Sequence, residues 1–365
     1  MLEQTHSKSD LGFTWHWEDE TLVLCPKGPK RGRRVLVVGF ASTGPDLFLS
    51  WLESRFGGHG MWGCMELAAN GYEVLLPRIR SRNPRSPSRL LWDLGVAMGA
   101  ASRLTRNDIV YCNHNVMFWA PFLRSIGRVK AKIVGLLFAR EPLPIGRAYD
   151  GVIGMTRIAT EHGRKVAGKA KHAHIPWGIE LTPDHHCYRQ YDPKWALSCG
   201  VTGRDQLTAV KVYQDLDLPL RVCARGQKFA ATSEKITVYS EMVSPEELTQ
   251  VLYRFANVVL ITLRPDPNMR EAVGYTNLLE SMAMGRAVIK TKTGAVDDDI
   301  NVEQSEIGLY VDPSDESSLK RAVTTLLHEP ERAEGLGKRG RKLAEEYYNM
   351  ARFGIDLHNF FESLG

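Results

Sequence analysis

The feature that most constrains the fold is a regular alternation between short apolar runs and stretches in which apolar residues recur with helical spacing. Residues 35–40 form a continuous apolar run, which is typical of a strand buried on both faces of a parallel sheet. A Gly-rich loop at 57–60, a helical pattern at 61–69 and a second apolar run at 73–76 follow it. This order predicts a β-α-β unit, whose crossover connection requires parallel strands.

The alternation occurs twice along the chain, which predicts two doubly wound α/β domains. In the first half, we expect further elements at residues 108–112, 118–126, 132–138 and 151–155. In the second half, strands and helices alternate from residue 195 to residue 327, including strands at 195–199, 220–224, 236–239, 258–263, 287–291 and 308–311 and helices at 206–215, 245–255, 277–284 and 316–327.

The boundaries follow from changes in composition along the chain. Residues 1–33 are polar and resemble an appendage with one short edge strand, and a polar, turn-rich segment near residue 185 resembles a linker. We therefore predict an N-terminal extension (1–33), a first Rossmann-like domain (34–185), a second one (186–345) and a C-terminal helix that packs back toward the first domain (346–365).

Composition narrows the class of protein. The 365 residues are 43% hydrophobic and 24% charged, which is ordinary for a globular chain. No apolar run approaches the roughly 20 residues of a spanning helix, and the N-terminus has no secretory pattern, so we expect a cytoplasmic protein. The six cysteines include no C-x-x-C pair, and the histidines at 172, 174, 185 and 186 fit a solvated loop better than a zinc site.

One segment, residues 271–289, carries most of the chemistry. Gly274 allows the backbone to approach a ligand, and the amides of Tyr275, Thr276 and Asn277 open a helix, which makes an anion site suited to a diphosphate. Glu280 lies about one turn further along, where a carboxylate can accept hydrogen bonds from ribose hydroxyls. The alternative is an ordinary loop followed by a surface charge.

This whole segment resembles the donor-site signature of glycosyltransferase family 4, in which a Glu, a Gly-containing loop and a second Glu precede Ala-Met-Ala-x-Gly and a buried strand. Glu271 and Glu280 are separated by eight residues, one more than is usual in the family. The family's donor-site role is therefore assigned more safely to Glu280 than to Glu271. By the same resemblance, Glu271 would face the donor sugar. Asp297 and the two Asp residues after it do not form a metal motif, and we interpret them as solvated charge.

Two further segments carry part of the resemblance. Residues 196–205 resemble the family's opening strand and glycine loop, but Val201 stands where the family has Arg, which leaves Arg204, next to Gly203, as the candidate cation for the diphosphate. The alternative for the Arg-Asp pair is helix capping. Residues 175–180 resemble the family's Pro-Asn-Gly-Val-Asp segment, with Trp177 in place of Asn.

The resemblance implies an α/β protein with the GT-B architecture, in which two Rossmann-like doubly wound domains face each other across a cleft. It implies a retaining hexosyltransferase or related glycosyltransferase that uses a nucleotide-sugar donor, UDP-sugar before GDP-sugar, without a metal or other cofactor. The acceptor would be a glycan, a lipid-linked compound or a small molecule. His114, Arg140 and Glu271 are the candidate catalytic residues, although a lone His114 is more often a loop hydrogen-bonder.

Basic residues interleaved with large apolar ones occur between Arg78 and Trp92, and again in residues 117–132. Such segments suit an anionic membrane surface, which would make the protein peripheral at the inner membrane face, or they are solvated loops whose apolar residues enter the core. No nucleic-acid module accompanies them. Competing functions are a non-transferring GT-B protein, such as an epimerase or phosphorylase, and a degenerate nucleotide-sugar binder.

Overall fold

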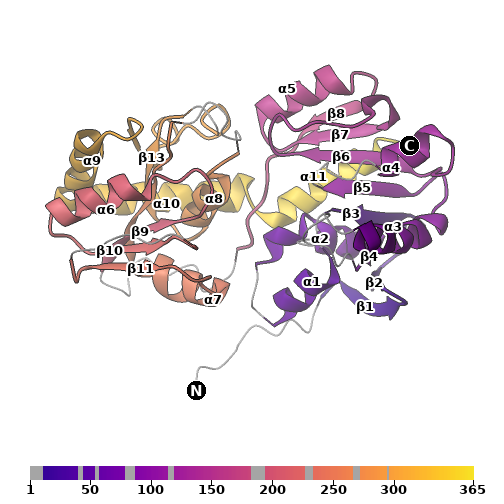
Figure 1. Ribbon diagram of the computed structural model, residues 1–365, viewed down its shortest axis with the longest axis horizontal. Helices are drawn as coiled ribbons and strands as arrows, with labels where there is room; N and C mark the ends of the chain where they lie inside the picture. Colours follow the sequence, from indigo (N-terminus) through magenta and orange to yellow (C-terminus); the bar gives the residue numbers. More distant parts are fainter. Residues whose placement is uncertain are drawn as a thin grey trace. The chain divides into compact units, whose positions relative to one another are not determined.

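The computed structural model describes residues 11–39, 44–53, 57–78, 87–113, 119–181, 194–226, 233–265, 272–293 and 296–365. The chain divides into two compact units: unit 1 comprises Met1–Trp177 with Met350–Gly365, and unit 2 comprises Gly178–Asn349. Each unit is built on one β-sheet with helices packed against it (Figure 1). The chain enters unit 2 a few residues before the predicted position, because Ile179 pairs with Asn349 and donates to the carbonyl of Tyr348 at 2.7 Å.

The described strands of unit 1 form one sheet in the order β1-β2-β4-β3-β5-β6-β7-β8. Pairing is parallel from β4 to β8 and antiparallel at the β1-β2-β4 edge. The central strands consist mainly of buried apolar residues, as the apolar runs predict. The strands are β1 (Phe13–Glu18), β2 (Thr21–Pro26), β3 (Arg34–Val38), β4 (Glu73–Pro77), β5 (Ile109–Asn113), β6 (Lys132–Leu137), β7 (Gly151–Gly154) and β8 (Lys171–His174).

The predicted N-terminal extension is wrong for residues 13–26. These residues form the hairpin β1-β2, which adds two antiparallel strands to the edge of the sheet. Leu22 and Leu24 are fully buried, so β2 is part of the core. The hairpin could not be predicted from hydrophobic pattern, because β1 is exposed at all positions after Phe13, as an edge strand can be.

The helical elements of unit 1 are α1 (Pro45–Leu52), η3 (Gly58–Met61), α2 (Cys64–Ala69), α3 (Pro87–Ser102), α4 (Trp119–Ser125), η4 (Gly146–Ala148), α5 (Arg157–Val166) and α11 (Met350–Glu362). No helix in the described ranges is long and apolar enough to cross a bilayer. The predicted C-terminal helix (346–365) begins later than expected, because Tyr348 and Asn349 interrupt the helical chain. The part before the break, α10 (Pro330–Tyr347), belongs to unit 2, and α11 belongs to unit 1.

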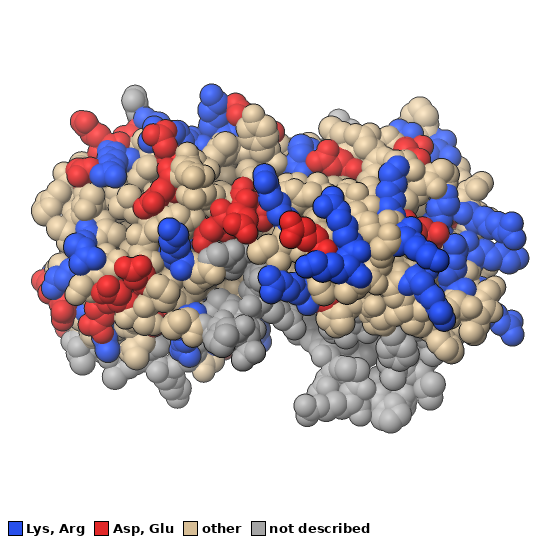
Figure 2. All heavy atoms as spheres, turned by 90° about the horizontal axis from the view of Figure 1, so that it is seen from above, with Lys and Arg blue, Asp and Glu red and all other residues tan. Residues whose placement is uncertain are grey.

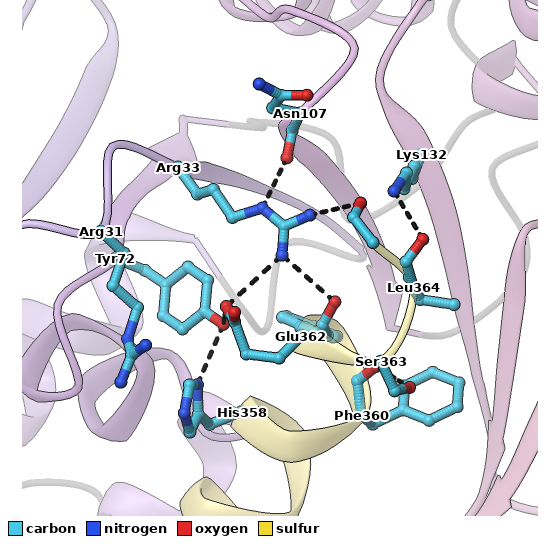
Figure 3. Close-up of polar contacts among 12 residues, drawn as sticks. Arg31, Arg33, Tyr72, Asn107, Lys132, His358, Phe360, Glu362, Ser363 and Leu364 are labelled. Atoms are coloured by element: carbon cyan, nitrogen blue, oxygen red, sulfur yellow. Dashed lines mark hydrogen bonds and ion pairs between the residues drawn. The ribbon is translucent and has the colours of Figure 1, made fainter.

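The C-terminal helix α11 is fastened to unit 1 at its far end (Figure 3). Arg33 donates to the carbonyl oxygens of Asn107 at 2.9 Å, Phe361 at 3.3 Å and Gly365 at 2.7 Å. The hydroxyl of Tyr72 donates to Glu362 at 2.8 Å, and this bond holds the pKa of the Glu362 carboxyl below its usual value. These bonds explain why the last helix is packed with the first unit, far from it in sequence.

The described strands of unit 2 form an entirely parallel sheet in the order β11-β10-β9-β12-β13-β14. The first strand, β9, lies between β10 and β12, so the direction of winding reverses between β9 and β12. The strands are β9 (Trp195–Cys199), β10 (Leu220–Cys223), β11 (Ile236–Tyr239), β12 (Ala256–Ile261), β13 (Ala287–Thr291) and β14 (Gly308–Val311). The helices are α6 (Gln206–Asp215), α7 (Pro245–Glu247), η6 (Leu248–Tyr253), α8 (Tyr275–Ala283), α9 (Glu316–His328) and α10.

Candidate nucleotide site

The reversal point of the unit 2 sheet is where an open α/β sheet ordinarily binds a ligand, beyond the carboxyl ends of its strands. Strand β9 ends there at Cys199, and the next residue, Gly200, has a φ of +111°. A Cβ atom on Gly200 would lie 2.7 Å from the guanidinium of Arg204, so only glycine leaves room for that side chain. The loop after β9 therefore positions a cation at the reversal point.

The guanidinium of Arg204 is buried and held by several acceptors. Its Nε donates to the carbonyl of Cys199 at 3.0 Å, its Nη1 donates to the carbonyl of Thr202 at 3.0 Å, and its Nη2 donates to Oδ1 of Asn277. Burial lowers the pKa of Arg204 from its usual value, and Glu280 is one of the groups that oppose this shift. Arg204 thus connects the loop after β9 to α8 across 73 residues of sequence.

Glu280 on α8 shares this cluster. Its Oε2 accepts a hydrogen bond from the hydroxyl of Tyr253 at 2.8 Å and another from Nδ2 of Asn277 at 3.3 Å. Burial raises the pKa of Glu280 to about 7, although these two bonds and the charge of Arg204 act in the opposite direction. A carboxyl with a pKa near neutrality, beside a cation at the reversal point of the sheet, is typical of a binding or catalytic site.

Helix α8 begins beside this cluster with no side-chain cap. Gly274, which precedes it, has a φ of +89°, and a Cβ there would lie 2.9 Å from Ile261. The first amide bonded within the helix is that of Leu278, which donates to the carbonyl of Gly274 at 3.0 Å. The amides of Thr276 and Asn277, in the first turn, therefore face outward, as an anion site requires.

The structure brings together most of the predicted donor residues. Arg204, Asn277 and Glu280 form one contact cluster, Gly274 precedes its helix, and the carbonyl of Gly203 accepts from the amide of Arg264 at 3.0 Å in the adjoining loop. Tyr275 has a fully buried ring, and Thr276 is half-buried in the first turn of α8.

The capping alternative holds for Asp205 and does not hold for Arg204. Oδ1 of Asp205 accepts from the amide of Thr208 at the start of α6, and Oδ2 accepts from the hydroxyl of Ser314 at 2.7 Å. Val201, which stands where the resembled family has Arg, is exposed. Arg204 therefore belongs to the cluster, whereas Asp205 caps the start of α6.

The sequence did not predict three residues of this region. Tyr253 and Cys199 complete the cluster, with Cys199 Sγ 3.1 Å from Nδ2 of Asn277, and no local pattern marks either of them. Lys290, at the end of β13, is fully buried and forms an ion pair with Asp297 at 2.6 Å. Interpreting Asp297 as solvated charge is thus wrong, because its carboxylate also accepts from the hydroxyl of Tyr310 at 2.8 Å.

The structure describes only one of the three candidate catalytic residues. Glu271 and His114 lie outside the described residues. Arg140 is exposed in unit 1, three residues after the end of β6. The predicted membrane segment also lies largely outside the described part, except that Arg78 forms an ion pair with Asp46 at 3.1 Å.

Comparisons with known proteins agree with this architecture. Residues 230–343 match the family model described as Glycosyl transferases group 1. None of the curated proteins matches the chain in sequence.

Solved structures match nearly the whole chain at low sequence identity. Sucrose-phosphate synthase from Thermosynechococcus elongatus has a TM-score of 0.67 at 15% identity, covering 92% of this chain and 99% of its own. HepE from Anabaena, in complex with UDP and glucose, has a TM-score of 0.61 at 12% identity, covering 91% and 99%. An α,α-trehalose-phosphate synthase (UDP-forming) from Burkholderia vietnamiensis has a TM-score of 0.60 at 12% identity, covering 90% and 100%. With its two Rossmann-like domains, the chain has the α/β GT-B fold.

Proposed function

We propose that this chain is a glycosyltransferase that moves a sugar from a nucleotide-sugar donor to a hydroxyl group of an acceptor, with unit 2 as the donor-binding domain. The observation that carries the proposal is the cluster of Arg204, Asn277 and Glu280 at the reversal point of the unit 2 sheet, beside the uncapped start of α8. The family model matched by residues 230–343, which include α8, supports the same activity.

The parts of the cluster have complementary roles in this proposal. The outward-facing amides of Thr276 and Asn277 bind the diphosphate, and the buried charge of Arg204 adds to the positive potential there. The carboxylate of Glu280 accepts hydrogen bonds from the ribose. Stabilisation of the departing diphosphate by fixed amides and a cation is the basis on which we propose retaining transfer without a metal.

For the donor we propose a UDP-sugar before a GDP-sugar. Support comes from HepE, whose solved complexes contain UDP and UDP-glucose, and from the UDP-forming trehalose-phosphate synthase. For unit 1 we propose the acceptor, a glycan, a lipid-linked compound or a small molecule. Arg140, together with His114 and Glu271, remains a candidate for contact with the reacting groups.

A second candidate function is nucleotide-sugar binding without transfer. It is favoured by Arg204, whose guanidinium already donates to the carbonyls of Cys199 and Thr202 and to Asn277. It is also favoured by Val201, an exposed aliphatic residue in place of the family's cation. In this case the site would hold a donor but would stabilise the leaving group poorly.

A thermal-shift panel of UDP-, GDP-, ADP- and dTDP-sugars tests the proposal. A ligand at about 100 times its Kd raises the free energy of unfolding by about 2.7 kcal/mol, so the preferred donor raises the unfolding temperature. The shift should be lost in Glu280→Ala and kept in Glu316→Ala, a matched change on α9. No shift with any nucleotide sugar would contradict the proposal. Release of free sugar from the bound donor then separates an enzyme from a binder.

A further inference from the structure

Unit 1 carries exposed apolar side chains on α4, just after α4 and at the end of α5. Phe122 on α4 and Ile126 just after it are 48% and 55% exposed, and their spacing of four residues places them on one face. Val166, at the end of α5, is 38% exposed. Helix α4 packs against η4, and Gly146 of η4 lies against the backbone of Val166, so these elements are neighbours.

The same elements carry a strong excess of positive charge. Residues 119–131 and 144–171 contain nine Lys and Arg but two acidic residues, and one of these, Asp150, is paired with Arg124. Figure 2, a view onto the α5 side of unit 1, shows many blue side chains and few red ones over that unit. We define the α4–α5 surface as Phe122, Ile126 and Val166 with six exposed cations, Arg128, Lys130, Arg147, Arg164, Lys165 and Lys169.

Helix α4 is held in place before any partner binds. Arg124 donates to the carbonyl oxygens of Lys130 at 2.7 Å and Ala131 at 2.6 Å, and it forms an ion pair with Asp150 at 3.2 Å. These contacts fix the end of α4 against the chain that leads into β6. The exposed apolar pair therefore needs no ordering step, and binding loses little conformational entropy there.

Exposed apolar side chains on elements that also carry several exposed cations match the chemistry of an anionic bilayer. Lys and Arg gain about 1 kcal/mol each near such a surface, which is about fivefold in affinity per cation. Their aliphatic stems and the apolar side chains enter the headgroup region. A sulfated polysaccharide such as heparin attracts the cations but has no apolar phase for Phe122 or Ile126. We propose that the α4–α5 surface docks unit 1 on an anionic lipid bilayer.

Co-sedimentation with vesicles tests this proposal and needs no nucleotide, so its result does not depend on the proposed enzymatic activity. We expect the full chain to bind vesicles of phosphatidylglycerol and phosphatidylcholine in equal parts, and to bind pure phosphatidylcholine much more weakly. Arg128→Glu with Lys165→Glu should lower the affinity at least about tenfold. The matched control, Lys211→Glu with Lys320→Glu on unit 2, should bind like the wild type.

A second variant separates a bilayer from a polyanion. Phe122→Ser with Ile126→Ser keeps every cation, and it should lower vesicle binding roughly tenfold while leaving retention on heparin unchanged. If this variant binds vesicles as tightly as the wild type, the surface is an electrostatic polyanion site and the proposal is wrong. Equal binding to neutral vesicles, or an equal loss in the control, would also overturn it. Unchanged unfolding midpoints show that each variant is folded. If Arg128→Glu with Lys165→Glu does not fold, Arg128→Gln with Lys165→Gln takes its place.

Discussion

Trp62 and Trp177 form a stacked pair in unit 1, with ring centroids 4.5 Å apart and planes inclined by 13°. Phe138 contacts Trp62 edge-on at 4.5 Å, and the indole of Trp177 donates to the carbonyl of His59 at 3.3 Å. Both indoles are buried. Trp177 stands where the resembled family has Asn, so in this chain aromatic packing and a hydrogen bond tie residues 175–177 to the Gly-rich loop at 57–60.

Replacing Trp177 by Asn should therefore destabilise unit 1 by roughly 3–5 kcal/mol, because it leaves a cavity beside Trp62 and buries an amide. Trp177→Phe keeps a ring in place and should cost less than half as much. Denaturant unfolding followed by tryptophan fluorescence measures both. A loss below about 1 kcal/mol for Trp177→Asn would show that the stack does not hold this segment.

Removing Arg33 should loosen the end of α11. Arg33→Ala deletes the bonds to Asn107, Phe361 and Gly365, and we expect a loss of roughly 2–3 kcal/mol with faster amide exchange at the end of α11. Lys30→Ala, an exposed cation on the same segment, is the control and should change stability by less than about 0.5 kcal/mol. Equal exchange in both variants would argue against the anchor.

The pKa of Glu280 predicts how stability depends on pH. Its folded value of about 7 lies above the ordinary 4.5, so the folded protein keeps a proton that the unfolded chain has lost. The free energy of unfolding should therefore fall as pH rises from about 4.5 to about 7, by up to roughly 2–3 kcal/mol from this group. Glu280→Gln should be more stabilised relative to the wild type at about pH 8 than at about pH 5. A difference that does not change with pH would contradict the burial of this carboxyl.

The buried pair of Lys290 and Asp297 should show strong coupling. Asp297→Asn keeps an acceptor for Tyr310 but leaves the ammonium of Lys290 without a counter-charge, which should cost roughly 3–5 kcal/mol. Adding Lys290→Met should recover most of that loss. Asp298→Asn, an exposed neighbour, should cost less than about 0.5 kcal/mol. Additive losses in the double variant would rule out the coupling.

The central strands and several helices could be predicted because their apolar patterns are local. Strand β9 and helix α6 occupy the predicted residues 195–199 and 206–215. The edges of the unit 1 sheet could not be predicted in this way. Strand β8 has the sequence Lys-His-Ala-His with no buried residue, and β1 is almost wholly exposed, so hydrophobic periodicity gives no signal for either.

The sequence predicted the residues of two segments of the candidate nucleotide site, Arg204 after the first strand of unit 2 and Gly274 to Glu280 around α8, but not the contacts between segments. Gly274, Asn277 and Glu280 lie on one loop and helix, and their spacing predicted an anion site with a carboxylate nearby. The contact of Asn277 with Arg204 spans 73 residues, and that of Tyr253 with Glu280 spans 27. Only the folded unit brings these residues together, because Arg204 follows β9, Tyr253 ends η6, and Asn277 and Glu280 lie on α8.

Hydrogen exchange with and without UDP-glucose is the most direct test of the claim that the start of α8 holds a diphosphate. Saturating donor should slow exchange of the amides of residues 274–280 and of the loop at 200–205, and Glu280→Ala should remove this protection. Protection confined to other parts of the chain, with the first turn of α8 unchanged, would contradict it.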